Sequence, residues 1–197
     1  MDKREASANE TRQRILEAAR QVLAQESEDA LSMDAIARRA DVSRLTIYYQ
    51  FKSRPGLLEA LYDYLASRGG MQRMPEVFRE PDPFKALDKL VAVFVAFWSS
   101  DQVVIRRLRG MAALDAEIRE GLLSRDARRQ HIAQEILKRM AAGRKKKCPG
   151  EQFAATADVI AALTGFATYD ALANAGHSDK EIVAMVARLV HFAASWK

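Results

Sequence analysis

The chain has 197 residues, of which 49% are hydrophobic and 29% charged, and its formal net charge is +5. This length suits one large domain, or a small domain joined to a larger one. No run of 18 apolar residues predicts a membrane span, and residues 1–14 lack the apolar core of a secretory signal. The single Cys148 has no intrachain disulfide partner. We therefore expect a cytoplasmic protein without a membrane partner.

The first predicted helix lies before residue 25. Its apolar residues recur at helical spacing, and they are Ile15, Leu16, Ala19, Val22 and Leu23. This stripe is suited to packing across two further helices.

A pair of short helices is predicted between residues 32 and 54. The Ser32 hydroxyl can cap the first of them, and Met33, Ile36, Ala37 and Ala40 form one apolar stripe at i, i+3, i+4 and i+7. This spacing is typical of a short amphipathic helix.

The second helix of the pair follows a sharp turn. Asp41 occupies this turn. Asp suits such a position because it tolerates the left-handed conformation better than most residues. Ser43 can cap the helix, and Ile47 and Phe51 point inward. The outward positions suit contact with base edges and phosphates, and they are Arg44, Leu45, Thr46, Tyr48, Tyr49 and Gln50. Such a unit places its second helix in the major groove of DNA.

The basic charge that matters for DNA is local. Residues 1–70 hold 11 basic and 11 acidic side chains, whereas residues 38–54 hold five basic side chains and one acidic one. A phosphate backbone would meet this local field.

This segment resembles the DNA-binding domain of the tetracycline-repressor (TetR) family, from about Thr11 to Leu65. The matching positions are Ala37, Ala40, Val42, Ser43, Thr46, Tyr48, Tyr49, Phe51, Ser53 and Arg54. Asp41 replaces the common turn glycine. Leu45 replaces a small residue near the start of the second helix, so the resemblance does not identify the operator sequence. The resemblance implies an all-α fold, with a three-helix DNA-binding domain at 1–70 and a larger ligand-sensing and dimerisation bundle at 71–197.

The resemblance also implies roles for single residues. It implies contacts with the phosphate backbone for Tyr48, Tyr49, Lys52 and Arg54. It implies contacts with base edges for Arg44, Leu45, Thr46 and Gln50. Arg can bond guanine, and Leu45 or Thr46 can meet a thymine methyl group. Ser32 and Ser43 stand at helix starts, where phosphates are commonly bound.

The remainder of the chain is predicted to be helical as well. A helix begins at Ser53 and ends at Gly69, and the proline-containing stretch 71–83 predicts a domain boundary. Further helices are expected at 83–100, around 102–114, at 116–142, at 151–175 and at 179–196. The lysine-rich tract 143–150 predicts an exposed loop.

The last two predicted helices are poor in charge, which indicates an interface between two subunits. The predicted interface residues on the last helix are Ile182, Val186, Leu189, Ala193 and Trp196. The alternative is that both helices are buried within one subunit. The resemblance favours a homodimer, because the last two helices of TetR-like proteins commonly form a four-helix bundle between subunits.

No catalytic or metal-binding pattern is present, since His131, His177 and His191 are widely spaced. A redox role for Cys148 remains open. An aromatic effector pocket is predicted from Phe94, Trp98, Met111, Phe166 and Tyr169, although ordinary core packing explains each residue equally well.

The resemblance therefore implies a ligand-responsive regulator, most simply a repressor. It would bind a palindromic double-stranded DNA operator as a homodimer and be released by a small-molecule effector, with no cofactor and no metal. The alternatives are a DNA-binding protein without a ligand and an enzyme built on a helical bundle.

Overall fold

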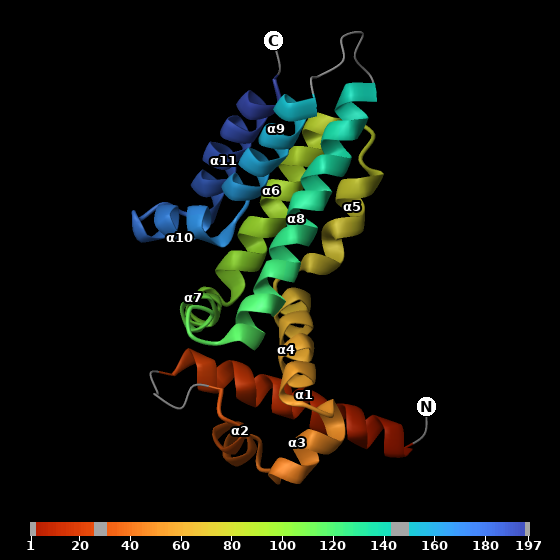
Figure 1. Ribbon diagram of the computed structural model, residues 1–197, viewed down its shortest axis with the longest axis vertical. Coiled ribbons are helices and arrows are strands. Elements are labelled where there is room, and N and C mark those ends of the chain that lie inside the picture. The colour runs from red at the N-terminus through yellow and green to blue at the C-terminus, as the bar shows by residue number, and fades with distance from the viewer. Residues whose placement is uncertain (1–2, 26–30, 143–149, 196–197) are drawn as a thin grey trace. The chain divides into compact units, whose positions relative to one another are not determined.

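The computed structural model describes residues 3–25, 31–142 and 150–195, and these residues form eleven α-helices and one 3-10 helix without a strand (Figure 1). The predicted all-α fold class is confirmed. None of the described helices is both long and apolar enough to cross a membrane. The chain forms two compact units, Met1–Leu65 with Val103–Leu122, and Ala66–Gln102 with Leu123–Lys197. The first unit thus consists of two separate segments of the chain. The prolines of the sequence predict only a single domain boundary near residue 70.

The first unit is built around the three predicted helices α1 (Lys3–Ala24), α2 (Met33–Ala40) and α3 (Arg44–Phe51). Most of a fourth helix, α4 (Arg54–Arg68), packs with them in the same unit. The apolar stripes of these helices face one another, and their least exposed members are Ile15, Ala19, Leu23, Ile36, Ile47, Leu57 and Leu61. Burial of such side chains contributes roughly 1.5–3 kcal/mol each to folding, so this core fixes α3 against α1 and α2.

A later segment completes the first unit, and it comprises α7 (Gln102–Met111) and the start of α8 (Ala116–Ala142). The Arg107 guanidinium donates to the carbonyl oxygens of Leu23 and Gln25 at the end of α1. The Tyr62 hydroxyl donates to the carbonyl oxygen of Ile118 at 3.2 Å. A Cβ atom at Gly121 would lie 2.6 Å from the Tyr62 ring, so only glycine allows this approach. The sequence did not predict this association.

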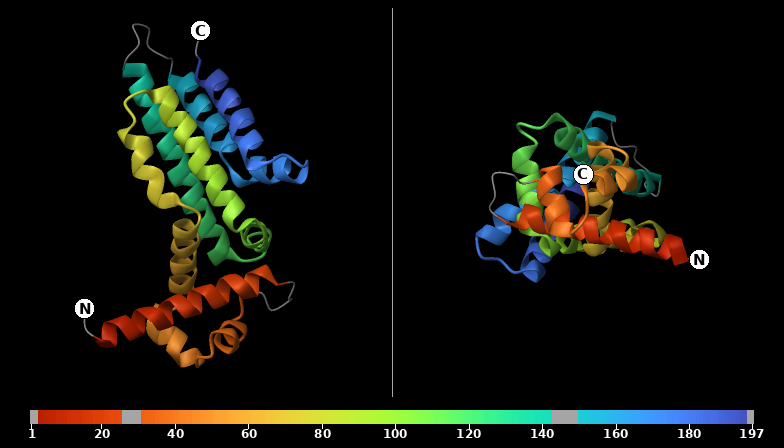
Figure 2. Two further views of the ribbon diagram at one scale, coloured as in Figure 1. Left: turned by 180° about the vertical axis from the view of Figure 1, so that it is seen from behind. Right: turned by 90° about the horizontal axis from the view of Figure 1, so that it is seen from below.

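The second unit is a helical bundle. Its helices are α5 (Met74–Arg79), α6 (Pro83–Ser100), most of α8, α9 (Gly150–Leu163), α10 (Phe166–Asn174) and α11 (Asp179–Ala194), with the 3-10 helix Met71–Arg73. Helices α6, α8, α9 and α11 run alongside one another, and α10 lies across their direction (Figures 1 and 2). Helix α6 has buried residues around most of its circumference.

Two features of the second unit differ from the expectation. Helix α5 forms within the proline-containing stretch, because Pro75 lies in the first turn of the helix, where its missing N–H costs nothing. The single helix expected at 151–175 is two helices. The backbone is extended at Gly165, with φ −78° and ψ 160°, and the Thr164 hydroxyl donates back to the carbonyl oxygen of Ile160 at 2.8 Å.

Candidate nucleic-acid interface

The turn between α2 and α3 has the geometry that its residues predict. The Ser32 hydroxyl accepts from the backbone N–H of Ala35 at 3.1 Å and caps α2. Asp41 takes the left-handed conformation, with φ 51° and ψ 53°, and this lets the backbone N–H of Val42 donate to the carbonyl oxygen of Ala37 at 3.1 Å. The turn therefore satisfies the end of α2 before α3 begins.

Helix α3 separates its side chains into a buried and an exposed face. Ile47 is fully buried and Phe51 is 5% exposed, so both anchor the helix from below. Leu45 is 77% exposed, Tyr49 76% and Tyr48 41%. Large apolar and aromatic side chains at such exposure mark a contact surface rather than a core.

Polar contacts hold several of the predicted DNA-binding side chains in place. The Arg44 guanidinium lies 3.4 Å from the Asp34 carboxylate of α2. The Lys52 ammonium lies 4.9 Å from the centre of the Tyr49 ring, which draws a cation to the exposed face of α3. Arg12 of α1 donates to the carbonyl oxygen of Gln50 at 3.0 Å. The first helix thereby supports the end of α3.

Arg54 is held by two carboxylates. One terminal nitrogen of its guanidinium lies 2.5 Å from the Asp115 carboxylate, and the other lies 2.5 Å from the Glu117 carboxylate. The hydrogen bonds that Arg54 donates to Asp115 are the main cause of a raised Arg54 pKa, and they also lower the pKa of Asp115. The sequence assigned Arg54 to a DNA phosphate, and no local pattern indicated partners more than 60 residues away.

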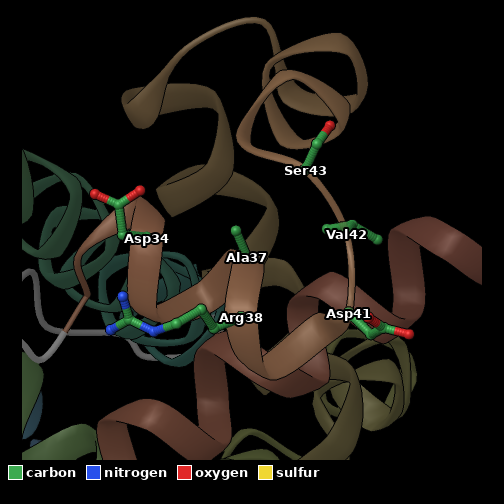
Figure 3. Close-up of a pocket in the computed structure, with 6 residues that line it drawn as sticks. All are labelled: Asp34, Ala37, Arg38, Asp41, Val42 and Ser43. Carbon is green, nitrogen blue, oxygen red and sulfur yellow. The ribbon is translucent and has the colours of Figure 1, made fainter.

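An open hollow of about 410 Å³ lies beside the turn. Asp34, Ala37 and Arg38 line it from α2, and the following link contributes Asp41, Val42 and Ser43 (Figure 3). Pockets for small molecules bury most of the ligand's surface. This hollow is open to solvent, so it does not have the enclosed shape of such a pocket.

Four of the five predicted effector-pocket residues come together in the second unit. The ring centroid of Trp98 lies 5.9 Å from that of Phe94 and 5.6 Å from that of Phe166, which in turn lies 6.5 Å from that of Tyr169. Met111 instead ends α7 in the first unit. Phe94, Trp98 and Tyr169, but not Phe166, line a space of about 10 Å³, which is the room for one water molecule.

Arg129 of α8 adds a cation to this aromatic cluster, which the sequence did not predict. Its guanidinium lies 5.9 Å from the centre of the Phe94 ring and 6.0 Å from that of Trp98. The same group donates to the carbonyl oxygen of Ala161 at 3.1 Å and to Asp126 at 2.7 Å. The Arg129 side chain therefore lies inside the bundle, at 11% exposure.

The predicted interface residues of α11 lie on two different faces. Ile182 and Val186 are buried inside the subunit, at 0% and 2% exposure. Leu189 is 50% exposed, Ala193 is half-buried, and Trp196 lies outside the described residues. The sequence prediction omitted Phe192, which is 82% exposed and lies three residues after Leu189. The i, i+3 spacing of Leu189 and Phe192 was the feature of the sequence that could have placed both residues on one exposed face.

Groups that would support other chemistry are scarce. The part of the chain that the structure describes holds no group of three His, Cys, Asp or Glu residues placed to bind a metal ion. The imidazole of His191 lies 2.8 Å from the Asp88 carboxylate, and that of His131 lies 4.0 Å from Glu135. Cys148 is outside the described residues, so its proposed redox role stays a prediction.

The capped α2–turn–α3 unit, its buried anchors and its exposed face define a helix-turn-helix protein. Residues 15–61 match the family model described as bacterial regulatory proteins, tetR family. This part of the chain is therefore similar to the DNA-binding segment of TetR-family regulators. It is 44% identical over 63 residues to the HTH-type transcriptional regulator SrpR of Pseudomonas putida, a match that spans 32% of this chain and only 28% of SrpR.

Solved structures resemble the whole chain in fold. One is a putative TetR-family transcriptional regulator from Syntrophomonas wolfei, with a TM-score of 0.76 and 17% identity over 95% of this chain and 96% of that one. Another is the transcriptional regulator FadR from Bacillus subtilis in complex with stearoyl-CoA, with a TM-score of 0.70 and 19% identity over 93% of this chain and 97% of that one. At these identities the likeness establishes the fold of both units.

Proposed function

We propose that this protein is a transcriptional regulator that binds double-stranded DNA through α3. The observation that carries the proposal is the exposure of Leu45, Tyr48 and Tyr49 on a helix whose opposite side is fixed by Ile47 and Phe51. A rigid helix with an exposed face of this kind fits the major groove. Arg44 and Lys52 on the same surface supply the charge that phosphates or base edges need.

We further propose that two copies associate through α9 and α11, which pack against each other within the subunit. Met185, Leu189 and Phe192 repeat at i, i+4 and i+7 along α11, and all three are half-buried or exposed. Ala155, Val159 and Ala162 repeat in the same way along α9, and all three are exposed. The small side chains of α9 would let a partner's helices approach closely. We propose this surface in place of the interface predicted from the sequence, because Ile182 and Val186 are buried in the subunit's own core.

A dimer of this kind would present two copies of α3 to a two-fold symmetric operator. The simplest regulatory outcome is repression, in which the bound protein blocks transcription until it is released. An effector would bind at the aromatic cluster of Phe94, Trp98, Phe166 and Tyr169. The B. subtilis FadR structure is a complex with stearoyl-CoA, which supports an effector for a protein of this fold.

The 10 Å³ space limits how an effector could bind. Any compound larger than water must separate α6 from α10 and α11, so binding would be coupled to a rearrangement of the second unit. Trp98 sits at the centre of the cluster, and its fluorescence therefore reports the event. A DNA-binding protein without an effector is the second candidate, and the closed cluster is the observation that favours it.

DNA binding is tested by fluorescence anisotropy with a labelled random-sequence duplex. Tyr49→Ala should weaken binding, since it removes an exposed aromatic side chain from α3 without touching the core. Phe78→Ala is the matched control, because Phe78 is an exposed aromatic residue on α5. The proposal fails if the wild type does not bind DNA, or if both variants bind as the wild type does.

A further inference from the structure

Arg54 occupies a position where a DNA-binding surface usually offers a cation to phosphate. It is the first residue of α4 and follows the last residue of α3 by three positions. The Ser53 hydroxyl accepts from the backbone N–H of Gly56 at 3.1 Å, so the helix start is already capped by an uncharged group. Arginine forks and helix N-termini are the groups that bind phosphate most readily.

The carboxylate that holds Arg54 is itself fixed by the fold. One Asp115 oxygen accepts from the backbone N–H of Ile118 at 3.1 Å, so Asp115 caps the start of α8. Glu117 lies in the first turn of the same helix. The nearby contact between Tyr62 and Ile118, with Gly121 against the Tyr62 ring, keeps α4 and this part of α8 close together. The Asp115 carboxylate is therefore held by the fold independently of Arg54, and Glu117 stands beside it on the same helix.

We propose that Asp115 and Glu117 are positioning residues of the DNA-binding surface, because they take the place on Arg54 that a DNA phosphate would otherwise occupy. The inference rests on the proposed DNA-binding function and deepens it. Both terminal nitrogens of the guanidinium point at carboxylates, and the same N–H groups cannot also face a phosphate. The acidic pair thus sets how many phosphates each copy of the protein binds.

Charge leads to the same conclusion. One guanidinium and two carboxylates carry a net charge of −1, so this corner of the surface repels a phosphate instead of attracting it. Arg54 also keeps the pKa of Asp115 below its usual value, which favours the ionised carboxylate further. Loss of one carboxylate would bring the cluster to neutrality and free part of the guanidinium for DNA.

The test measures the salt dependence of binding to a labelled random-sequence duplex, because that slope counts phosphate contacts. Glu117→Gln removes one charge at a half-exposed position, and Asp115→Asn removes the other while keeping a side chain that can cap α8. Glu120→Gln is the matched control, since Glu120 is an exposed carboxylate one turn further along α8. Thermal unfolding of each variant checks that the fold is kept.

Glu117→Gln and Asp115→Asn should each bind DNA several-fold more tightly than the Glu120→Gln control. They should also steepen the slope of log affinity against log salt by about 0.9 for each regained phosphate contact. Adding Arg54→Ala to either variant should abolish the extra slope. The inference is overturned if these variants behave as Glu120→Gln does, or if they bind more weakly with an unchanged slope. If the wild type shows no salt-dependent binding, the proposed function itself fails, and the inference fails with it.

Discussion

The hydroxyl of Ser43 lies 2.9 Å from the hydroxyl of Thr46 and also accepts from the backbone N–H of Thr46 at 3.1 Å. This pair closes the first turn of α3. It also occupies the Thr46 side chain, which the sequence had assigned to base reading together with Leu45. Leu45 is by contrast 77% exposed, so it is the better placed of the two to meet a thymine methyl group.

Ser43→Ala should lower the free energy of unfolding by about 1 kcal/mol, because the first turn of α3 loses its N-cap. DNA affinity should fall as well, since α3 would fray at the end that carries Leu45. Urea denaturation gives the stability change. Ser67→Ala on the exposed side of α4 is the control, and equal effects of the two substitutions would contradict the capping role.

Leu45→Ala should change the preference for particular base pairs and leave the salt slope of binding unchanged. The reason is that an apolar side chain contacts base methyl groups and no phosphate. Arg44→Ala should cost about 1–3 kcal/mol at the base pairs it reads. Titrations on a bound duplex and its single-base variants measure both effects. A uniform loss across all variants would show that these residues contact only the backbone.

The first unit was largely predictable, because its signals are local. Caps at Ser32 and Ser43, the turn at Asp41, and apolar stripes at helical spacing each fall within one or two helical turns. Asp41 has a positive φ, so it adopts the left-handed conformation for which glycine is the common residue at such a turn. The contacts that could not be predicted join residues that are far apart in the sequence.

The contacts of Arg54 and Arg129 illustrate this limit. Arg54 meets residues more than 60 positions away, and Arg129 enters the aromatic cluster although its sequence neighbours suggest a solvated face. The division of α11 into a buried and an exposed face was missed for a related reason. Two apolar stripes on one helix look alike in sequence, and only packing against α6 shows which stripe is internal.

Acid should destabilise the fold through Glu17. Hydrogen bonds from Arg20, and then from Tyr64 and Gln21, lower the Glu17 pKa from 4.5 to about 2. Because the pKa in the folded state is depressed, this stabilisation is present above pH 4.5 and is lost as the pH falls towards 2. Unfolding experiments across that range should show a shallower loss for Glu17→Gln.

The control for this experiment is Glu10→Gln, which removes an exposed carboxylate from the same helix. Its profile should follow that of the wild type. If Glu17→Gln also follows the wild type, the contact between Tyr64 and Glu17 at 2.7 Å does not stabilise α1 against α4 through charge.

Phe192→Glu should dissociate the proposed dimer, because it would place a charge within an apolar surface on both copies. Phe192 is 82% exposed in the subunit, so the substitution should leave the fold of the single chain unchanged. Light scattering should report the mass of a dimer for the wild type and 22.1 kDa for the variant. Ala127→Glu, at an exposed position on α8, should remain dimeric. A 22.1 kDa wild type would contradict the proposed interface.

Operator recognition by two copies of α3 is tested by sequencing the DNA that the protein selects from a random pool of duplexes. Two copies that each insert α3 into the major groove predict two inverted half-sites, with centres about 10–10.5 base pairs apart or a multiple of that spacing. Leu45→Ala or Arg44→Ala should alter the same position in both half-sites. Selection of no preferred sequence, or of a site without two-fold symmetry, would contradict the account.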